Sequence, residues 1–419
     1  MNTSYLRKLL LGTLLGGLSV LPAYAAEPVR LGLIEPFSGP IASIGLETLD
    51  NFNFAVEAVN KRGGVLGGRM IEMVPLDNAM NAEKSTQQVK KAIDMGIRVV
   101  VQGVGSSNAI NIIEYVNKHN KRNPDQTVLY LNHAAVTTEF TNELCSFWHF
   151  RFDANVDMKV AALATQMGRD PKVKNVYLIN QNYAFGKSTQ EASNKYLAER
   201  AKHIKIVGDD LIVPFGKVQD FTPYVAKIKG ANADTVLTGN WGPDIIRLVK
   251  AVASAGLNVQ FYTLYGGLPT TVNAVGTEDG MAVHMKQVTE QLVEDDDRKD
   301  LQPYFESYLD KFKRTWYSDR IRFTVEMFAK AIDKAGKEDP EAIARALEGM
   351  TFPGPHGQTM VMRPDDHQIQ LPMVISEMSR DVPKRFIYEG KDLGIGWKTM
   401  NWVSREDLTL PTTCKMERP

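Results

Sequence analysis

An alternation of strand-like and helix-like segments, repeated twice along the chain, constrains the fold more than any other feature. Short apolar runs rich in β-branched residues alternate with segments of helical periodicity. In the first half the strands are expected at 29–34, 70–75, 97–101 and 127–131, and the helices at 46–61, 82–95 and 110–118. The order restarts after Phe152, with strands at 175–179, 204–207, 234–238 and 260–264. Such β-α-β-α order predicts parallel sheets covered by helices, and 419 residues exceed what one core usually serves. We therefore expect two α/β lobes.

The N-terminal segment predicts export. Arg7 and Lys8 precede an apolar run at 9–21, and Ala23-Tyr24-Ala25 has the small-x-small pattern of a signal peptidase site. Residues 1–25 are thus expected to be a cleavable signal peptide, with the periplasm as destination. The apolar run is too short to span a bilayer.

Two cysteines, Cys145 and Cys414, follow the signal segment. An oxidising compartment favours a disulfide between them, and two unpaired buried thiols are the alternative.

Charge and motifs exclude several function classes. The 49 basic residues balance the 49 acidic ones, which leaves no basic field for nucleic acid or an anionic membrane. The sequence has no HExxH, GxSxG or CxxC motif, and the seven histidines are dispersed. Residues 103–108 carry only two of the three glycines of a dinucleotide-binding motif, and 185–188 only half of a P-loop. We expect no metal, no cofactor and no catalysis.

The turns after the predicted strands have the chemistry of a binding site. Ligands of open α/β sheets bind beyond the carboxyl ends of the strands. In the first half these turns offer small polar residues and backbone; Ser106 and Ser107, at a predicted helix start, favour an anionic group such as a carboxylate. In the second half they offer rings and an amide: Tyr183, Phe185, Asn240, Trp241 and Tyr265. Ordinary helix caps and core aromatics are the alternative reading.

Longer stretches carry a family resemblance. IEPFSGPIASIG (34–45) and AVEAVNKRGGVLGGRMIEMVPLDNAMNAEKS (55–85), with YAFGKS and GPDIIRLVKAVASAGL further on, resemble type I periplasmic binding proteins of the leucine/isoleucine/valine-binding family. The resemblance runs from about Val29 to Gln287 and more loosely to Gly357. It implies two doubly wound, Rossmann-like lobes joined by a hinge of several segments, and a monomer that delivers a small ligand to the membrane permease of an ABC importer.

The resemblance also implies a division of the chain. Lobe 1 would comprise residues 26–152 and 283–350, and lobe 2 residues 153–282 and 351–419. The crossings would lie near 151–154, 282–285 and 351–355.

Site residues follow by the same resemblance. Ser106 matches the serine that holds the ligand carboxylate. Ala134, Ala135 and Val136 match the loop that shares the contacts to the ligand carboxylate and ammonium. Ile44 and Val104 match positions that line the side-chain pocket. Phe185, and Asn240 or Trp241, match the aromatic positions that cover the ligand. Two positions depart: Val136 replaces a threonine, and Tyr265 replaces the acid that pairs with the ligand ammonium.

A buried ammonium without a carboxylate partner is costly, so these departures favour a carboxylate with an apolar or aromatic body. Asp244 or Glu278 could supply the missing charge, which keeps branched-chain amino acids as the alternative. A ligand-sensing receptor subunit, or an enzyme dependent on Ser106, would use the same fold for another purpose.

Overall fold

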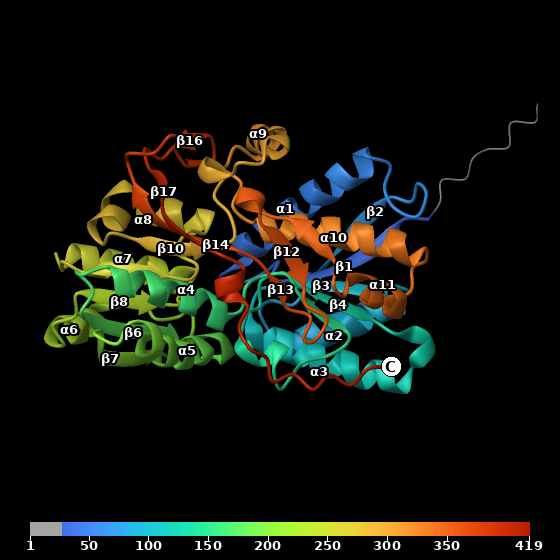
Figure 1. Ribbon diagram of the computed structural model, residues 1–419, viewed down its shortest axis with the longest axis horizontal. Helices are drawn as coiled ribbons and strands as arrows, with labels where there is room; N and C mark the ends of the chain where they lie inside the picture. Colours follow the sequence, from blue (N-terminus) through green and yellow to red (C-terminus); the bar gives the residue numbers. More distant parts are fainter. Residues whose placement is uncertain (1–26) are drawn as a thin grey trace, which may run out of the picture.

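The computed structural model describes residues 27–419, which form two α/β lobes side by side (Figure 1). The predicted signal segment lies outside the described residues. Within the described part, no helix has the length and apolar character needed to cross a membrane. The predicted fold class is confirmed.

The first lobe is built on a five-stranded parallel sheet of order β2-β1-β3-β4-β5. Its strands are β1 (Val29–Glu35), β2 (Ile71–Asp77), β3 (Val99–Gln102), β4 (Leu129–Asn132) and β5 (His149–Arg151). Its helices are α1 (Ala42–Lys61), α2 (Ala82–Asp94), α3 (Ser106–Arg122), α10 (Asp319–Ala335) and α11 (Pro340–Leu347).

Alternation along each strand divides this lobe into two cores. Val99 and Val101 of β3 pack in the cluster that includes the apolar faces of α1, α10 and α11. Val100, between them, packs with α2 and α3. Successive side chains of a strand point to opposite faces, and a sheet covered on both sides needs apolar residues at every position. The unbroken apolar runs of the sequence are explained in this way.

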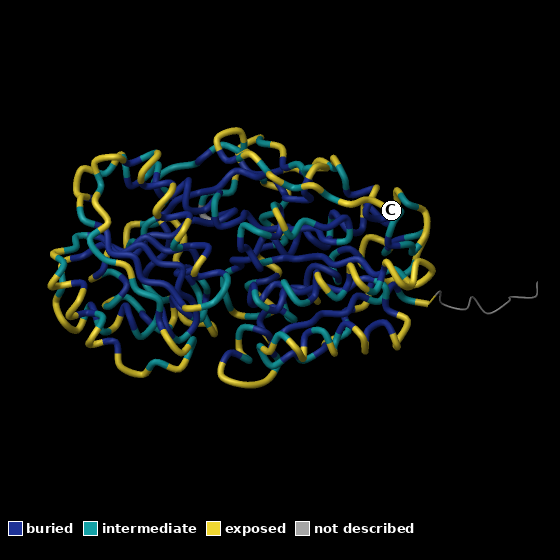
Figure 2. The backbone as a smooth tube through the Cα atoms, turned by 90° about the horizontal axis from the view of Figure 1, so that it is seen from below, coloured by how far each residue is buried: buried dark blue, intermediate teal, exposed yellow. Residues whose placement is uncertain are grey.

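The second lobe has a seven-stranded sheet of order β17-β14-β10-β9-β8-β6-β7. Five strands are parallel: β6 (Asn175–Gln181), β7 (Lys205–Ile212), β8 (Thr235–Thr238), β9 (Gln260–Thr263) and β10 (Lys286–Thr289). The antiparallel pair β14 (Met373–Ser379) and β17 (Gly396–Val403) extends one edge. Helices cover both faces: α4 (Val156–Arg169), α5 (Ala184–Arg200), α6 (Thr222–Gly230), α7 (Pro243–Ser254) and α8 (Pro269–Ala282). Figure 2 shows buried backbone through the interior of both lobes and exposed segments around it.

Sheet membership departs from the predicted division at two places. Residues 286–289, placed in lobe 1 by the prediction, form β10 of the second sheet, so the chain leaves that sheet after Thr289 and not near 282–285. Residues 351–370, placed in lobe 2, include a separate three-stranded sheet of β11 (Thr351–Pro353), β12 (Thr359–Met362) and β13 (Ile369–Gln370). That sheet contributes Met360, Met362 and Ile369 to the large core cluster that also holds α10 and α11.

The C-terminal tail returns to the first lobe after β17. Cys414 forms the predicted disulfide with Cys145, at a Cα–Cα distance of 5.7 Å. The Thr412 hydroxyl donates to the Thr141 carbonyl, and the Arg418 guanidinium binds Glu348. Smaller elements complete the chain: α9 (Gln302–Phe312) and the ribbon of β15 (Ile387–Tyr388) and β16 (Lys391–Asp392).

Candidate functional site

A cavity that is partly open to solvent lies where the carboxyl ends of the parallel strands of the two sheets face each other. Its walls come from the turns after β3, β4, β6, β8 and β9, together with α1 and α10. Most of the predicted ligand-binding residues line it: Ile44, Val104, Ser106, Ala134, Val136, Tyr183, Phe185, Trp241 and Tyr265.

Three predicted residues do not line the cavity. Ala135 packs in the core beneath the first sheet, and Asn240 is fully buried behind the turn. Ser107 lies half-buried on α3, one residue beyond the lining Ser106. Adjacent residues of a turn or helix point in different directions, which a match by alignment does not resolve.

The β3–α3 turn brings backbone and a hydroxyl to the cavity. Gly105 has φ +97°, in the left-handed region that favours glycine, and a Cβ on Gly103 would lie 2.7 Å from the Ala134 nitrogen. Ser106 then begins the 17-residue helix α3, whose N-cap is Gly105 and so leaves the first N–H groups without a side-chain cap. The first N–H groups and the positive end of the helix dipole are therefore at the cavity wall, where they favour a carboxylate.

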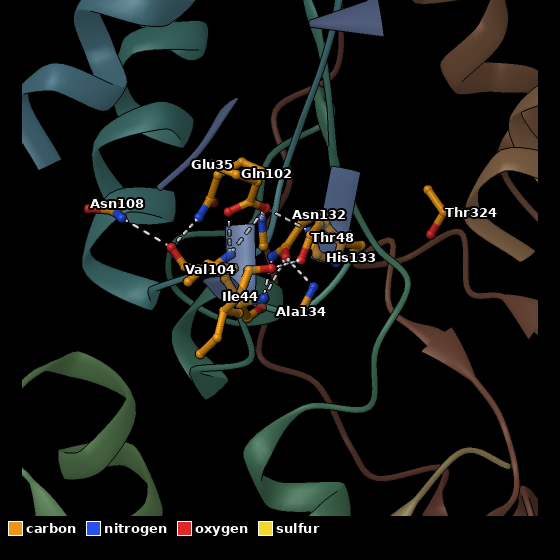
Figure 3. A network of polar contacts seen from close by, with 12 residues as sticks. Glu35, Ile44, Thr48, Gln102, Val104, Asn108, Asn132, His133, Ala134 and Thr324 are labelled. Carbon is orange, nitrogen blue, oxygen red and sulfur yellow. Dashed lines mark hydrogen bonds and ion pairs between the residues drawn. The ribbon is translucent and has the colours of Figure 1, made fainter. Parts of the chain in front are cut away.

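A buried carboxylate that the sequence reasoning missed positions this wall (Figure 3). Glu35, at the end of β1, accepts hydrogen bonds from the N–H groups of Gly103 at 2.8 Å and Val104 at 3.1 Å. Its Oε1 also lies 2.7 Å from His133 Nε2, so it joins the turns after β3 and β4. Glu35 is fully buried. An acid that ends an otherwise apolar strand was the available signal in the sequence.

The turn after β4 is shaped by Asn132. Its Oδ1 accepts hydrogen bonds from the N–H groups of Ala134 and Ala135 at 3.2 and 2.8 Å, as in an Asx turn. Ala134 and Val136 line the cavity on either side of the buried Ala135. Val136, where the resemblance implies a threonine, therefore brings no hydroxyl to the cavity wall.

Aromatic rings form the second-lobe wall. The Trp241 indole donates a hydrogen bond to the Tyr183 hydroxyl at 2.7 Å. The Phe185 ring centroid lies 5.9 Å from that of Tyr183 and 5.7 Å from that of Tyr265. Tilted rings at these distances pack favourably, and all of them line the cavity.

The acids considered as replacements for the missing ammonium partner do not line the cavity. Asp244 accepts hydrogen bonds from Gln181 Nε2 at 2.9 Å and the Gly216 N–H at 2.8 Å. Burial raises the pKa of its carboxyl. Glu278 lies on α8, also outside the cavity lining.

Tyr265 is held by a buried charge cluster next to the cavity. Its hydroxyl donates to Asp153 at 2.8 Å, and Asp153 pairs with Lys159 at 2.8 Å. Burial and the charge of Asp153 raise the pKa of Tyr265 well above its usual range. Arg320 lines the cavity and pairs with Glu290 at 3.0 Å. The phenol at the predicted acid position is therefore a neutral donor committed to Asp153.

One face of α1 was also missed as part of the cavity. Glu47, Thr48 and Asn51 line it together with the predicted Ile44. The spacing i, i+3, i+4, i+7 places all four on one helix face. In the sequence, the signal was three polar residues on one face of a predicted helix.

The architecture defines the class of protein: two doubly wound lobes with one cavity at their facing edges are the fold of two-lobed solute-binding proteins. Residues 28–383 match the family model described as "Periplasmic binding protein", and the chain belongs to this periplasmic family of solute-binding proteins. The predicted resemblance and function class are thereby confirmed.

Relatives cover nearly the whole chain. "Leu/Ile/Val-binding protein homolog 4" of Brucella abortus is 33% identical in an alignment of 409 positions that covers 94% of each protein. A closed crystal structure of a leucine-, isoleucine-, valine-, threonine- and alanine-binding protein from Brucella ovis is 31% identical, with a TM-score of 0.83 over 94% of this chain and 100% of that one. An R. palustris solute-binding protein solved with benzoate shares the fold at 19% identity, with a TM-score of 0.72 over 93% and 99% of the two chains.

Proposed function

We propose that the cavity binds a small carboxylate with an apolar or aromatic body, and that the protein delivers it in the periplasm to the permease of an ABC importer. One observation carries this proposal: the cavity has a helix N-terminus with Ser106 on one wall and four rings on the other.

The carboxylate would bind at the first wall. The Ser106 hydroxyl and the free N–H groups of the first turn of α3 are donors held by a turn that Glu35 fixes from behind. Donors fixed before the ligand arrives need little ordering on binding, which favours affinity. Hydrogen bonds to a charged acceptor are also stronger than those to a neutral one.

The apolar body would bind between the rings of Tyr183, Phe185, Trp241 and Tyr265. Burial of apolar area contributes about 25 cal/mol per Å² before the costs of ordering and association. Contact with an enclosed aromatic wall therefore supplies much of the binding free energy, and the carboxylate supplies orientation.

Branched-chain amino acids are the second candidate ligands. They are favoured by the names of the relatives from Brucella abortus and Brucella ovis, at 33% and 31% identity. Both candidates share the carboxylate and the apolar body, and they differ in the ammonium group.

Titration calorimetry of the mature protein against aliphatic, aromatic and amino acids tests the proposal. The Ser106→Ala variant should lose about 10-fold in affinity for the ligand found, since a hydrogen bond to a charged group contributes about 1.5–3 kcal/mol. Ser107→Ala is the matched control, because Ser107 does not line the cavity. Equal affinities of the two variants would place the carboxylate elsewhere.

A further inference from the structure

One ionisable side chain on the cavity wall lacks a partner within residues 27–419. The charged or titratable basic and acidic residues that line the cavity are Glu47, His133 and Arg320. His133 pairs with Glu35 at 2.7 Å, and Arg320 pairs with Glu290 at 3.0 Å. The carboxyl of Glu47 makes no hydrogen bond or ion pair with the described residues, although the residue is only 9% exposed.

The polar neighbours of Glu47 on α1 already have hydrogen-bond or ion-pair partners. The Thr48 hydroxyl donates to the Ile44 carbonyl at 2.8 Å, and Asn51 Oδ1 accepts a hydrogen bond from the Tyr308 hydroxyl. Asp50, on the solvent side, pairs with Arg314 at 2.7 Å. Of these polar residues, Glu47 alone has a carboxyl group at the cavity with no partner among the described residues.

An unpaired carboxylate in such a place is unfavourable by itself. Burial raises the pKa of Glu47 to about 7, although the positive charge of Arg314 opposes the rise. A cation at hydrogen-bonding distance would stabilise the charged form and satisfy its acceptors.

We propose that Glu47 is the specificity-determining residue that receives the cationic group of the ligand. The inference rests on the proposed function and narrows it to a zwitterion with an apolar body. Both charged groups would then be bound by the first lobe, at Ser106 and Glu47, and the second lobe would supply the rings. Tyr265, which donates to Asp153, needs no role in charge recognition.

The proposed pairing makes ligand affinity depend on pH in a defined direction. A bound cation lowers the pKa of Glu47 below its value of about 7 in the free protein, so binding releases a proton. Affinity should rise as pH increases from 6 to about 7 and level off above it. A ligand without a cation should behave in the opposite way, because its carboxylate raises the pKa of Glu47 and its affinity falls above pH 7.

Other ionisable groups that face Glu47 or the same cavity come from several elements. They are Asp50, His133, Tyr183, Tyr265, Tyr308, Arg314, Arg320 and Tyr388. The pH profile must therefore be measured with Glu47→Gln as well, in which the linkage at position 47 is removed and the profile should flatten.

Two matched probe pairs separate the cation from the rest of the ligand. L-Leucine and 4-methylpentanoate share a carboxylate and an apolar body and differ in the ammonium group, as do L-phenylalanine and 3-phenylpropanoate. Calorimetry at pH 6 and pH 8 should show the amino acid of a pair binding the wild-type protein more tightly at pH 8. Glu47→Gln should lose at least ~10-fold for the amino acid and nothing for the simple acid.

Glu57→Gln provides the control, since it makes the same chemical change on α1 at a half-exposed residue that pairs with lysines outside the cavity. It should leave all affinities unchanged. Equal losses for both members of a pair in Glu47→Gln, or tighter binding of the simple acid by wild type, would overturn the role of Glu47 and leave the proposed function standing. Failure of wild type to bind any of the four probes would overturn the proposed function for this ligand class and the inference with it.

Discussion

The two walls of the cavity are built on different principles. In the first lobe, the turns after β3 and β4 are fixed by hydrogen bonds to buried Glu35 and Asn132, so backbone groups are held in place from behind (Figure 3). In the second lobe, buried side chains also hold the turns, since Asn180 Oδ1 accepts from the Gly239 N–H at 2.8 Å and Gln181 Nε2 donates to the Trp241 carbonyl at 3.0 Å. These turns, however, bring aromatic rings that contact one another to the cavity, and not backbone groups.

This difference separates two tasks. Charged groups of a ligand need donors and acceptors at fixed positions, because hydrogen bonds weaken steeply with distance and angle. Apolar burial is non-directional, so rings can cover bodies of different shape. The first wall therefore suits recognition of charge, and the second wall suits coverage of the apolar part.

Removing the support of the first wall should have the largest effect. Glu35→Ala leaves the Gly103 and Val104 N–H groups and His133 buried without their acceptor. Leaving several buried donors without their acceptor costs about 3 kcal/mol or more in total, at about 1–3 kcal/mol for each donor. We expect the free energy of unfolding in urea to fall by that amount and ligand affinity to fall with it. Glu57→Ala, at a half-exposed site on α1, should change stability by less than ~0.5 kcal/mol. Equal stabilities of the two variants would show that Glu35 does not support the wall.

Removing a ring from the second wall should lower affinity by the same factor for ligands with and without an ammonium group. Trp241→Ala removes a nearly buried ring and the donor to Tyr183. Truncation of a central aromatic contact costs about 2 kcal/mol, or roughly 30-fold in affinity. The loss should be equal for leucine and 4-methylpentanoate, because in the proposed binding mode the ring would contact the apolar body that they share. Trp402→Ala is the control, since Trp402 lies in β17 outside the cavity lining. A loss confined to leucine would assign charge recognition to the second wall.

The sequence predicted the architecture because apolar runs and helical periodicity are local properties. The predicted strands at 97–101 and 175–179 agree with β3 and β6, and the predicted helix at 110–118 lies within α3, which begins four residues earlier. Most of the residues that the sequence predicted to bind a ligand line the cavity, since the carboxyl ends of parallel strands meet at one edge.

What the sequence did not predict depends on contacts between distant segments. Glu35 acquires its function from N–H groups that lie 68 and 69 residues away. Glu47 was missed because the charged group was sought at the family position now held by Tyr265, whereas the unpaired carboxyl lies on the opposite lobe. Residues 286–289 belong to the second sheet because they pair with β9 and β14, and no local sequence pattern specifies that pairing.

The smallest effect should come from restoring the missing hydroxyl. Val136 lines the cavity at 1% exposure, and its carbonyl accepts a hydrogen bond from the Val156 N–H at 2.9 Å, so the backbone of the turn is fixed. In Val136→Thr the hydroxyl would meet the ligand carboxylate, and the gain of about 1.5–3 kcal/mol from a hydrogen bond to a charged group is partly offset by the loss of about 0.8 kcal/mol of methyl burial. We expect affinity to increase about 3-fold by calorimetry.

Val136→Ala separates this hydroxyl from a simple change of shape. It removes apolar contact and adds no donor, so affinity should fall. Without ligand, the threonine variant should be slightly less stable than wild type, because its hydroxyl is buried before a partner is present. Ligand should therefore raise the melting temperature of Val136→Thr more than that of wild type. If threonine lowers affinity as alanine does, the carboxylate does not reach position 136, and the charge-recognising part of the first wall is limited to the β3–α3 turn and α1.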